Sequence, residues 1–573
     1  MRKWKILHQK TKEIIKVLLK NRGLKTKKEI EEFLNPPNPS NLEPKTLNIK
    51  TSELAKAVKR IKKAIKENES IVVYSDYDAD GVCGAAILWE TLNELGAKAM
   101  PYIPHRVEEG YGLSQKGIDF VKKEHGASLI ITVDHGISSL EKVAYAKKQG
   151  IEVIVTDHHV PPKVPKVPKV PTIHTVDLCG AGVGWILAKE LQKIPGIKGA
   201  KFRESESYLD LVAIATIADM VPLTGANRTL VKHGLEELNK QSFSSNQTKR
   251  IGLEALIKET GIKKGGIGVY EVSHILAPRL NAMGRMEHAM DSLRLLCTRN
   301  KERAYELARH LDRTNRERQR LMEETSFHAE NLLIKHAAAC QRGTKLIFLS
   351  HASYNQGIIG LVAGKLVEKF YRPAIIVSLG EEYSKASARS INGFNIIETI
   401  RKAQDLLVDA GGHPMAAGFT VETKKLPELE KRLMEIAEQE LDSEKLTRVL
   451  KNDCEINLED SNHELYEKIR KFAPFGLGNP EPVFATRGVI VKDARIVGSD
   501  GKHLKLIVSQ EFPELNALNS GNSKHSAVAF GMAELFPQLS PEKKIDIAYT
   551  LSVNEWNGDK RLELKIKDIK IGD

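Results

Sequence analysis

The stretch Ile71-Val72-Val73-Tyr74-Ser75-Asp76-Tyr77-Asp78-Ala79-Asp80-Gly81 decides the fold. Its apolar, mostly β-branched start predicts a buried strand, and the run from Val82 to Leu95 predicts a helix. The three carboxylates between them lie at the carboxyl end of the strand, where open α/β sheets bind ligands. Carboxylates this close raise one another's pKa unless a cation neutralises them, and hard oxygen ligands suit Mg²⁺ or Mn²⁺. The simpler alternative is a polar loop whose aspartates cap the helix.

Length and composition are those of a large globular protein. The 573 residues predict several domains at about 100 to 200 residues each. A net charge of +13, from 87 Lys and Arg against 74 Asp and Glu, favours partners that carry phosphate. No apolar run of about 18 residues and no signal-peptide core are present, so we expect a cytoplasmic protein without membrane contact. The five cysteines are scattered and lack a C-x-x-C spacing, which argues against a disulfide framework or a thiolate zinc site.

Strand-like and helix-like segments alternate after the acidic loop. Strand patterns cover residues 99–103, 129–133 and 153–156, and helical patterns cover 114–123 and 140–148. This alternation is typical of βαβ units, so it predicts a parallel sheet with helices on both faces.

Two further strands end in polar residues, as the first does. Residues 129–133 run into Asp134-His135-Gly136, and residues 153–156 run into Asp157-His158-His159. Neighbouring parallel strands present their carboxyl ends at one edge of a sheet, so we expect these side chains to meet. Asp219 follows an apolar helical run over 209–217, where a charge is costly unless it is paired or bound to metal.

Taken together, these motifs resemble the DHH phosphoesterase superfamily and, within it, the RecJ family of bacterial single-strand-specific exonucleases. The motifs are Asp76-Tyr77-Asp78-Ala79-Asp80-Gly81, Asp134-His135-Gly136, Asp157-His158-His159 and Ala218-Asp219. Further matches, in order along nearly the whole chain, are Tyr111-Gly112-Leu113, Gly180-Ala181-Gly182-Val183, Ala277-Pro278-Arg279-Leu280-Asn281-Ala282, Gly284-Arg285-Met286 and Gly411-Gly412-His413-Pro414-Met415-Ala416-Ala417-Gly418. The chain departs from the family pattern at His135 and at a Lys-Val-Pro repeat over 163–171.

The resemblance implies an α/β fold with several domains. It implies an N-terminal helical segment (1–45), a DHH domain with a parallel sheet (46–300), a long connecting helix (301–339), a smaller α/β DHH-associated domain (340–445) and a C-terminal β-barrel OB-fold (446–573). OB-folds bind single strands by stacking bases on aromatic side chains over a basic groove. The candidate aromatics here are Phe530, Tyr549 and Trp556, and the alternative for each is a place in the core. Basic residues such as Lys502, His503, Lys505 and Lys524 are further candidates for the binding.

The resemblance also implies a site with two Mn²⁺ or Mg²⁺ ions, bridged by Asp134. The expected metal ligands are Asp76, Asp78, Asp80, Asp134, His158 and Asp219, and the expected catalytic residues are Asp134, Asp157, His158 and His159. In this scheme Asp157 orients a ligand and His159 contacts the scissile phosphate. The expected substrate-binding residues are Arg279, Asn281, Arg285, Ser387, Arg389, Ser390, Gly411, Gly412 and His413.

The function so implied is a metal-dependent 5′ to 3′ exonuclease that acts on single-stranded DNA, releases 5′-mononucleotides and serves DNA repair and recombination. Its expected partners are single-stranded DNA, a single-strand-binding protein and a helicase, with the chain as a monomer. One alternative is a DHH-family oligoribonuclease or a phosphodiesterase for small substrates. Another is a non-catalytic single-strand-binding replication scaffold. The complete set of acids and histidines argues against the scaffold, and the OB-like section argues against a small substrate.

Overall fold

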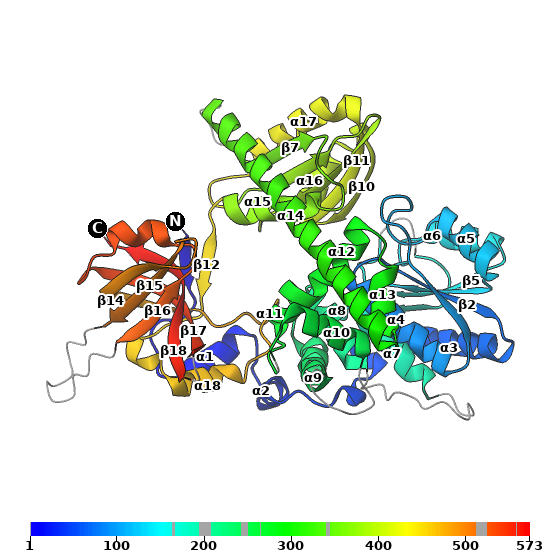
Figure 1. Ribbon diagram of the computed structural model, residues 1–573, viewed down its shortest axis with the longest axis horizontal. Helices are drawn as coiled ribbons and strands as arrows, with labels where there is room; N and C mark the ends of the chain where they lie inside the picture. Colours follow the sequence, from blue (N-terminus) through cyan, green and yellow to red (C-terminus); the bar gives the residue numbers. More distant parts are fainter. Residues whose placement is uncertain are drawn as a thin grey trace. The chain divides into compact units, whose positions relative to one another are not determined.

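The computed structural model describes residues 2–162, 167–193, 208–241, 250–263, 265–339, 344–510, 524–556 and 559–572. They form two compact units (Figure 1). The larger unit comprises Asn38–Val221 and Thr229–Thr447, and the smaller unit comprises Met1–Pro37, Pro222–Arg228 and Arg448–Asp573. Both ends of the chain therefore belong to the smaller unit, whereas the sequence suggested a separate segment over 1–45. Among the described helices, none is long and apolar enough to cross a bilayer.

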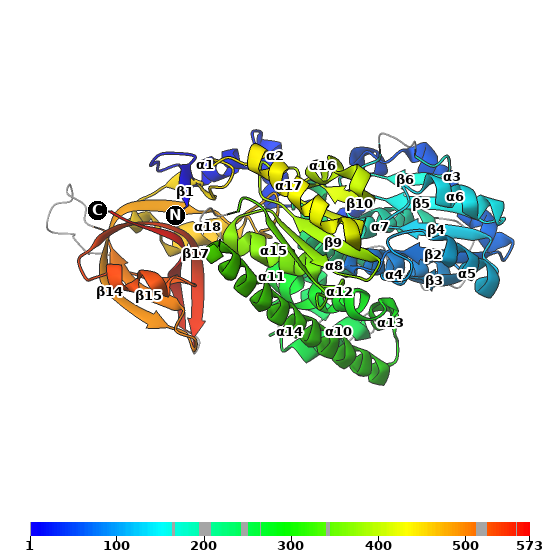
Figure 2. The ribbon, with the colours of Figure 1, turned by 90° about the horizontal axis from the view of Figure 1, so that it is seen from above.

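A five-stranded parallel sheet, in the order β3-β2-β4-β5-β6, lies in the larger unit and can be followed in Figure 2. Its strands are β2 (Ser70–Ser75), β3 (Lys98–Tyr102), β4 (Leu129–Val133), β5 (Glu152–Asp157) and β6 (Thr172–His174). The helices around it are α3 (Thr51–Lys66), α4 (Ala79–Glu94), α5 (Gln115–His125), α6 (Leu140–Lys148) and α7 (Gly180–Leu191).

Helices cover both faces of this sheet. Residues of α5 and α6 share an apolar cluster with Val72, Ile130 and Val155 on one face. On the other face α4 approaches so closely that a Cβ at Gly84 would lie 2.6 Å from the side chain of Val133. Double coverage explains why every residue of β2 and β4 is buried, and why these strands are continuous apolar runs.

A helical layer follows the sheet in the sequence. It consists of α8 (Leu209–Ala218), α9 (Gly225–Gln241), α10 (Ile251–Thr260), α11 (Val269–Glu271), the π-helical turn η4 (Val272–Leu276), α12 (Ala277–Met286) and α13 (Met290–Cys297). The long helix α14 (Lys301–Ala339) packs against α10, α12 and α13 and then against α15, so it links this layer to the second half of the unit (Figure 1).

The second half of the larger unit holds a mixed sheet in the order β10-β11-β9-β8-β7. Its strands are β7 (Ile347–His351), β8 (Ala374–Ser378), β9 (Tyr383–Arg389), β10 (Leu407–His413) and β11 (Ala416–Glu422), and its helices are α15 (Ile359–Phe370), α16 (Ile396–Arg401) and α17 (Leu426–Glu440). Only β7 and β8 pair in parallel among these strands, and the other pairs are antiparallel.

The smaller unit is built on a β-sheet in the order β13-β14-β15-β16-β18-β17, and β14 also pairs with β17. The pairings therefore run from β14 round the sheet and back to β14, as in a small barrel. The strands are β12 (Val449–Asn452), β13 (Cys454–Glu455), β14 (Phe484–Val497), β15 (His503–Ser509), β16 (His525–Ala529), β17 (Lys544–Trp556) and β18 (Asp559–Ile571).

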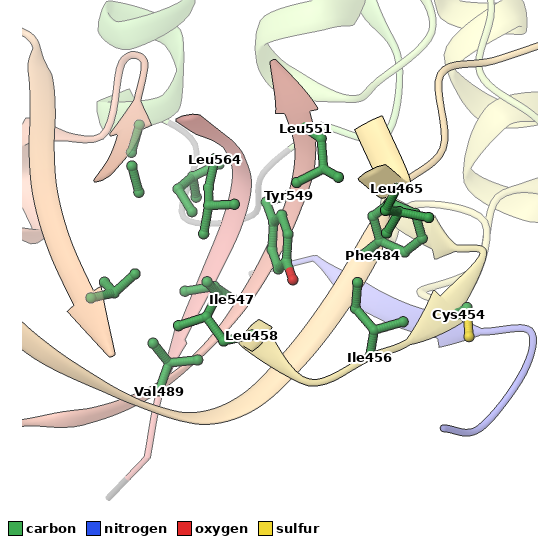
Figure 3. Close-up of a cluster of buried hydrophobic side chains, with 14 of the residues drawn as sticks. Cys454, Ile456, Leu458, Leu465, Phe484, Val489, Ile547, Tyr549, Leu551 and Leu564 are labelled. Carbon is green, nitrogen blue, oxygen red and sulfur yellow. The ribbon is translucent and has the colours of Figure 1, made fainter. Parts of the chain in front are cut away.

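The N-terminal residues complete this unit. Strand β1 (Lys3–Ile6) pairs in parallel with β12, and helices α1 (Ile14–Asn21), α2 (Lys27–Leu34) and α18 (His463–Arg470) add apolar residues to the barrel core. Figure 3 shows Tyr549 within that core, among Phe484, Ile547 and Leu564. Its hydroxyl lies 2.6 Å from Ser461 Oγ and 2.9 Å from Thr486 Oγ1, so its polar end is satisfied in the interior.

A buried cation holds the helical layer of the larger unit together. Arg250 is 3% exposed, and its guanidinium lies 3.1 Å from Glu90 on α4 and 3.3 Å from Asp210 on α8. It also donates to the carbonyl of Leu296 at 2.9 Å. Three helices thus depend on one guanidinium, because its removal leaves two carboxylates in the interior.

We expect Arg250→Met to lower the free energy of unfolding of the larger unit by about 3–5 kcal/mol, since the carboxylates of Glu90 and Asp210 lose their cation. Urea titration measures the change. The matched control is Arg294→Met, whose side chain is 53% exposed and pairs with Asp291, and which should change stability by less than about 1 kcal/mol. Similar losses in the two variants would contradict a structural role for Arg250.

Candidate metal centre and substrate site

The polar residues at three strand ends meet at one edge of the parallel sheet. Asp76 directly follows β2, Asp134 directly follows β4, and Asp157 is the last residue of β5. The backbone N–H of Asp76 donates to Val133 O at 3.2 Å, and that of Asp134 donates to Thr156 O at 3.1 Å, so the pairing of the strands continues into the acidic residues. Sheet register therefore sets the spacing of the carboxylates.

The first acidic loop contains both a helix cap and candidate ligands. Asp78 is the N-cap of α4, and its Oδ1 accepts from the backbone of Asp80 and Gly81 at 2.9 and 3.1 Å. The capping interpretation is thus correct for one oxygen of Asp78. Asp80 reaches the start of α7, where its two oxygens accept from the N–H groups of Gly180 and Ala181 at 2.6 Å each.

Asp134 stands at the centre of the cluster. Its backbone has a φ of +66°, a left-handed conformation that is uncommon for a residue with a side chain. The Nε2 atom of His158 lies 3.1 Å from its Oδ1 and 3.6 Å from a carboxylate oxygen of Asp219. Oδ1 of Asp134 and Oδ1 of Asp76 are buried, and neither accepts a hydrogen bond from a described residue.

These residues form three overlapping groups of potential ligands, in each of which the donor atoms lie within 4.8 Å of one another. The groups are Asp76, Asp78 and Asp134; Asp80, His158 and Asp219; and Asp134, His158 and His159. Buried carboxylate oxygens without hydrogen-bond partners, together with an imidazole, fit Mn²⁺ or Mg²⁺. Asp134 and His158 each belong to two groups, so the three groups form one continuous cluster.

Burial and mutual repulsion disfavour the ionised form of the carboxylates in the cluster. Burial raises the pKa of Asp134 well above its usual value, and the charge of Asp80 raises it further. Burial likewise raises the pKa of Asp76, and Asp78 adds to the shift. Burial also lowers the pKa of His158, which favours the neutral imidazole that binds metal. A bound cation stabilises the ionised carboxylates and the neutral imidazole together.

His159 is held in a different state by Asp157. Its Nδ1 lies 2.8 Å from Asp157 Oδ1. Burial lowers the pKa of His159, but this hydrogen bond and the charges of Asp157, Asp80 and Asp76 together outweigh burial, so the pKa is raised. Burial alone opposes ionisation of Asp157, but the hydrogen bond and charge of His159 bring its pKa down to about 2. The second oxygen of Asp157 accepts from the N–H of Ile137 at 2.8 Å. This geometry suits Asp157 to orienting His159.

Two residues of the site had no role assigned from sequence. The hydroxyl of Tyr111 donates to the carbonyl of Asp134 at 2.7 Å and lies 3.3 Å from Nε2 of His159. His135, the departure from the family pattern, is buried with its Nε2 3.0 Å from Tyr74 O, and burial lowers its pKa to about 4. A neutral His135 therefore ties the loop after β4 to β2. Tyr111 is part of a motif in the sequence, but its partner Asp134 lies 23 residues away, so the motif alone does not indicate the contact.

A group of four arginines lies where the two halves of the larger unit meet. Arg285 donates to the carbonyl of Gly357 at 3.3 Å, and burial together with the charges of Arg106, Arg318 and Arg389 lowers its pKa to about 10. Burial and the charge of Arg106 also lower the pKa of Arg389. Four guanidiniums this close favour an anion among them. Sequence reasoning missed Arg106 and Arg318, which no motif singled out.

The structure distributes the expected substrate-binding residues unevenly. Arg389 donates to Ser387 Oγ at 3.3 Å, and both lie against Gly360 of α15. Arg279 instead pairs with Asp312 at 2.8 Å, and the hydroxyl of buried Ser390 donates to Phe394 O at 2.7 Å. The guanidinium of Arg279 and the hydroxyl of Ser390 thus already have partners within the protein.

Asn281 and the Gly411–His413 segment approach the centre from opposite halves of the larger unit. Asn281 accepts from the N–H of Ala79 at 2.7 Å, so it fixes the acidic loop. The ring of His413 stacks on that of His159 with centroids 6.2 Å apart and planes 15° apart. Gly412 has a φ of +140°, and a Cβ there would lie 2.4 Å from Ala416 O. Residues 163–166 of the Lys-Val-Pro repeat lie outside the described residues.

In the smaller unit, one of the two candidate aromatics with a described side chain is available for stacking. Phe530 is 53% exposed, with Lys565 Nζ 5.5 Å from its ring centroid and the ring of His503 at 5.2 Å. Tyr549 is buried, so the second of the two positions that its sequence left open, the core rather than a stacking surface, is correct. The side chain of Trp556 lies outside the described residues.

Family profiles match three parts of the chain. Residues 70–216 match the DHH family, N-terminal domain, residues 343–439 match the DHHA1 domain, and residues 452–568 match the RecJ OB domain. The relatives include the single-stranded-DNA-specific exonuclease RecJ of Bacillus subtilis, which is 36% identical over 98% of this chain and 68% of its own length. The RecJ of Haemophilus influenzae is 31% identical over 90% of each chain.

Solved structures agree with these matches. Crystal structures of RecJ from Thermus thermophilus in complex with Mn²⁺ and with Mg²⁺ cover the whole of this chain with TM-scores of 0.79 and 0.73, at 29% identity. They are matched over 80% and 79% of their own lengths. The named ions agree with the ligand set derived above from this chain's own geometry.

We expect Asp134→Asn to change thermal stability in opposite directions with and without metal. In EDTA the raised pKa values of Asp76 and Asp134 mean that their contribution to stability is present below about pH 4 and is lost as the pH rises through the folded-state values. The variant, which lacks one charge, should therefore melt above the wild type at pH 8.

With Mn²⁺ at about 100 times its Kd, the wild type gains about 2.7 kcal/mol of stability and the variant gains less, so the order reverses. Differential scanning calorimetry measures both melting temperatures, and Glu323→Gln on the exposed side of α14 is the isosteric control. An equal decrease in EDTA and in Mn²⁺ would show that Asp134 is only structural.

Proposed function

The chain belongs to the RecJ family of single-stranded-DNA-specific exonucleases, and from this premise we propose that it degrades DNA single strands in the 5′ to 3′ direction and releases 5′-mononucleotides. The observation that supports the proposal most is the group Arg106, Arg285, Arg318 and Arg389 beside the acidic cluster, since Asp78 acts electrostatically on Arg285. A phosphate-binding group next to a metal centre suits an enzyme that starts at a strand end.

Each part of the centre has a separate task in this proposal. Mn²⁺ or Mg²⁺, when bound, makes a water nucleophilic at neutral pH and neutralises phosphoryl charge. Asp76, Asp78, Asp80, Asp134, His158 and Asp219 would hold the ions. Asp157 raises the pKa of His159 and so favours its protonated imidazole, which can donate to a non-bridging oxygen of the scissile phosphate. Asp157 keeps that ring oriented, as the partners of ligands and catalytic histidines commonly do.

The terminal phosphate is placed between the two halves of the larger unit. Arg389 and Ser387 stand at the end of β9, and Arg285 comes from α12 of the first half. A guanidinium fork and a hydroxyl match the several acceptors of a terminal phosphate. Because Arg279 and Ser390 already have partners within the fold, we assign the terminal phosphate to Ser387, Arg389, Arg285 and Arg106 instead.

We expect Arg389→Ala to raise the KM for 5′-phosphorylated single strands by about 10- to 100-fold, because one charge-assisted interaction is lost. Strands with a 5′-hydroxyl should be affected much less. Steady-state kinetics on both substrates measures the difference, and Arg401→Ala at the exposed end of α16 is the control. Equal losses on the two substrates would mean that Arg389 contacts the backbone of the strand rather than its end.

Duplex DNA should be a poor substrate. The acidic cluster is bounded on one side by the strand ends of the parallel sheet and on the other by the β10–β11 segment, where His413 reaches the ring of His159. We propose that the barrel of the smaller unit holds the following nucleotides through Phe530 and the basic residues beside it. The larger unit then acts on one strand while the barrel sustains processive degradation.

Point variants test the barrel better than truncation, because Met1–Pro37 shares its core. Phe530→Ala should raise the Kd for a long single strand by about 5- to 100-fold without changing the salt dependence, since stacking releases no counterions. Lys565→Ala should reduce the slope of log K against log salt by about 0.7. Fluorescence anisotropy at several salt concentrations measures both, with Phe120→Ala on α5 as the control. Unchanged binding in both variants, or rapid digestion of blunt duplex, would contradict this account.

We also propose a cellular role and an oligomeric state for the protein. An exonuclease specific for single strands serves DNA repair and recombination, and it acts in the cytoplasm on strands that a helicase has opened and a single-strand-binding protein has covered. The candidate metal ligands and the arginine group all lie within one copy of the larger unit, so we propose that the chain works as a monomer.

A further inference from the structure

A pair of exposed aromatic rings lies outside the metal centre and the arginine group. The ring of Tyr270 stacks on that of His274, with centroids 4.5 Å apart and planes 16° apart. Tyr270 is 63% exposed, and His274 is exposed as well. A near-parallel pair of rings in solvent leaves an outer π-face open, and that face has the size and chemistry to take a nucleic-acid base.

The local backbone holds this pair in a defined orientation. Tyr270 belongs to α11, and His274 belongs to the π-helical turn η4 that continues it. The hydroxyl of Ser273 lies 2.6 Å from Nδ1 of His274 and donates to the carbonyl of Tyr270 at 3.3 Å, which restricts the imidazole. Buried Val272 and Leu276 anchor the turn from the other side. Single π-helical turns are frequent at functional sites.

The pair is connected directly to the centre through its own helix. The turn η4 runs without a break into α12, which contributes Asn281 to the acidic loop and Arg285 to the arginine group. At a rise of about 1.5 Å per residue, His274 lies about 10 Å along the helix from Asn281. The same turn packs on α8, whose C-cap is Asp219. The rings therefore lie within the length of a few nucleotides from the centre.

We propose that Tyr270 and His274 form a base-stacking platform for a nucleotide of the bound single strand, a few positions from the scissile phosphate. This inference rests on the proposed exonuclease function. Stacking on a π-face is independent of base identity, so the platform suits an enzyme that must accept any sequence. It adds a contact within the larger unit that does not depend on the barrel.

Kinetics on substrates of different length tests the platform. Tyr270→Ala should raise the KM for a 20-nucleotide single strand by about 5- to 100-fold at an unchanged kcat, because one stacked base is lost. Hydrolysis of a dinucleotide, which ends before the platform, should stay as in the wild type. The matched control is Tyr270→Phe, which keeps the ring and should behave as the wild type. His274→Ala should reproduce part of the effect.

Fluorescence gives a readout that a purely structural role would not alter. A strand with 2-aminopurine at successive positions, bound in EDTA so that no cleavage occurs, should be quenched at one position by the wild type and by Tyr270→Phe but not by Tyr270→Ala. Identical fluorescence at every position in all three proteins would overturn the proposal, as would equal kinetic losses on the dinucleotide and the long strand. If the wild type cleaves no strand at all, the exonuclease assignment fails, and the 2-aminopurine result still decides whether the platform binds a base.

Discussion

The mutual repulsion of buried carboxylates at the carboxyl edge of the parallel sheet is the constraint on which the rest of the site depends. Sheet register brings Asp76 and Asp134 together, Asp80 joins them from the first turn of α4, and burial raises the pKa of each. No described basic side chain reaches Asp134 Oδ1 except the imidazoles of His158 and His159. The fold therefore stores an unfavourable arrangement that divalent cations relieve, and stability lost at a functional site is offset elsewhere in the unit.

The backbone around the cluster has to come unusually close to keep this arrangement. A Cβ at Gly81 would lie 2.6 Å from Asp76 O, and a Cβ at Gly180 would lie 2.6 Å from Asp134 Cβ, so any side chain at either position displaces a ligand. An excess of arginine lies beside the acids, with Arg285 from the first half of the unit and Arg389 from the second. Like charges are thus gathered in each of the two groups, and a substrate phosphate with bound cations compensates both.

Much of this could be predicted from the sequence, because the information is local. A β-branched run followed by carboxylates predicts both a buried strand and a ligand at its end, and three such runs predicted the edge where Asp76, Asp134 and Asp157 lie. Other features depend on partners distant in the chain. Arg279 is engaged by Asp312, and Tyr549 lies in the core.

Arg106 and Arg318 could not be predicted from the sequence for the same reason, because their partners are distant in the chain. Arg106 follows β3 and Arg318 lies on α14, so only the packing of α14 and the loop after β3 around α12 brings them to Arg285. A long charged helix and an isolated arginine look alike in sequence whether they face solvent or a ligand.

Crystals grown with Mn²⁺, measured at the manganese absorption edge, test the central claim most directly. The account predicts two anomalous peaks about 3.5–4 Å apart, with the carboxylate of Asp134 between them and His158 bound to one. A single peak, or peaks that do not touch Asp134, would contradict it.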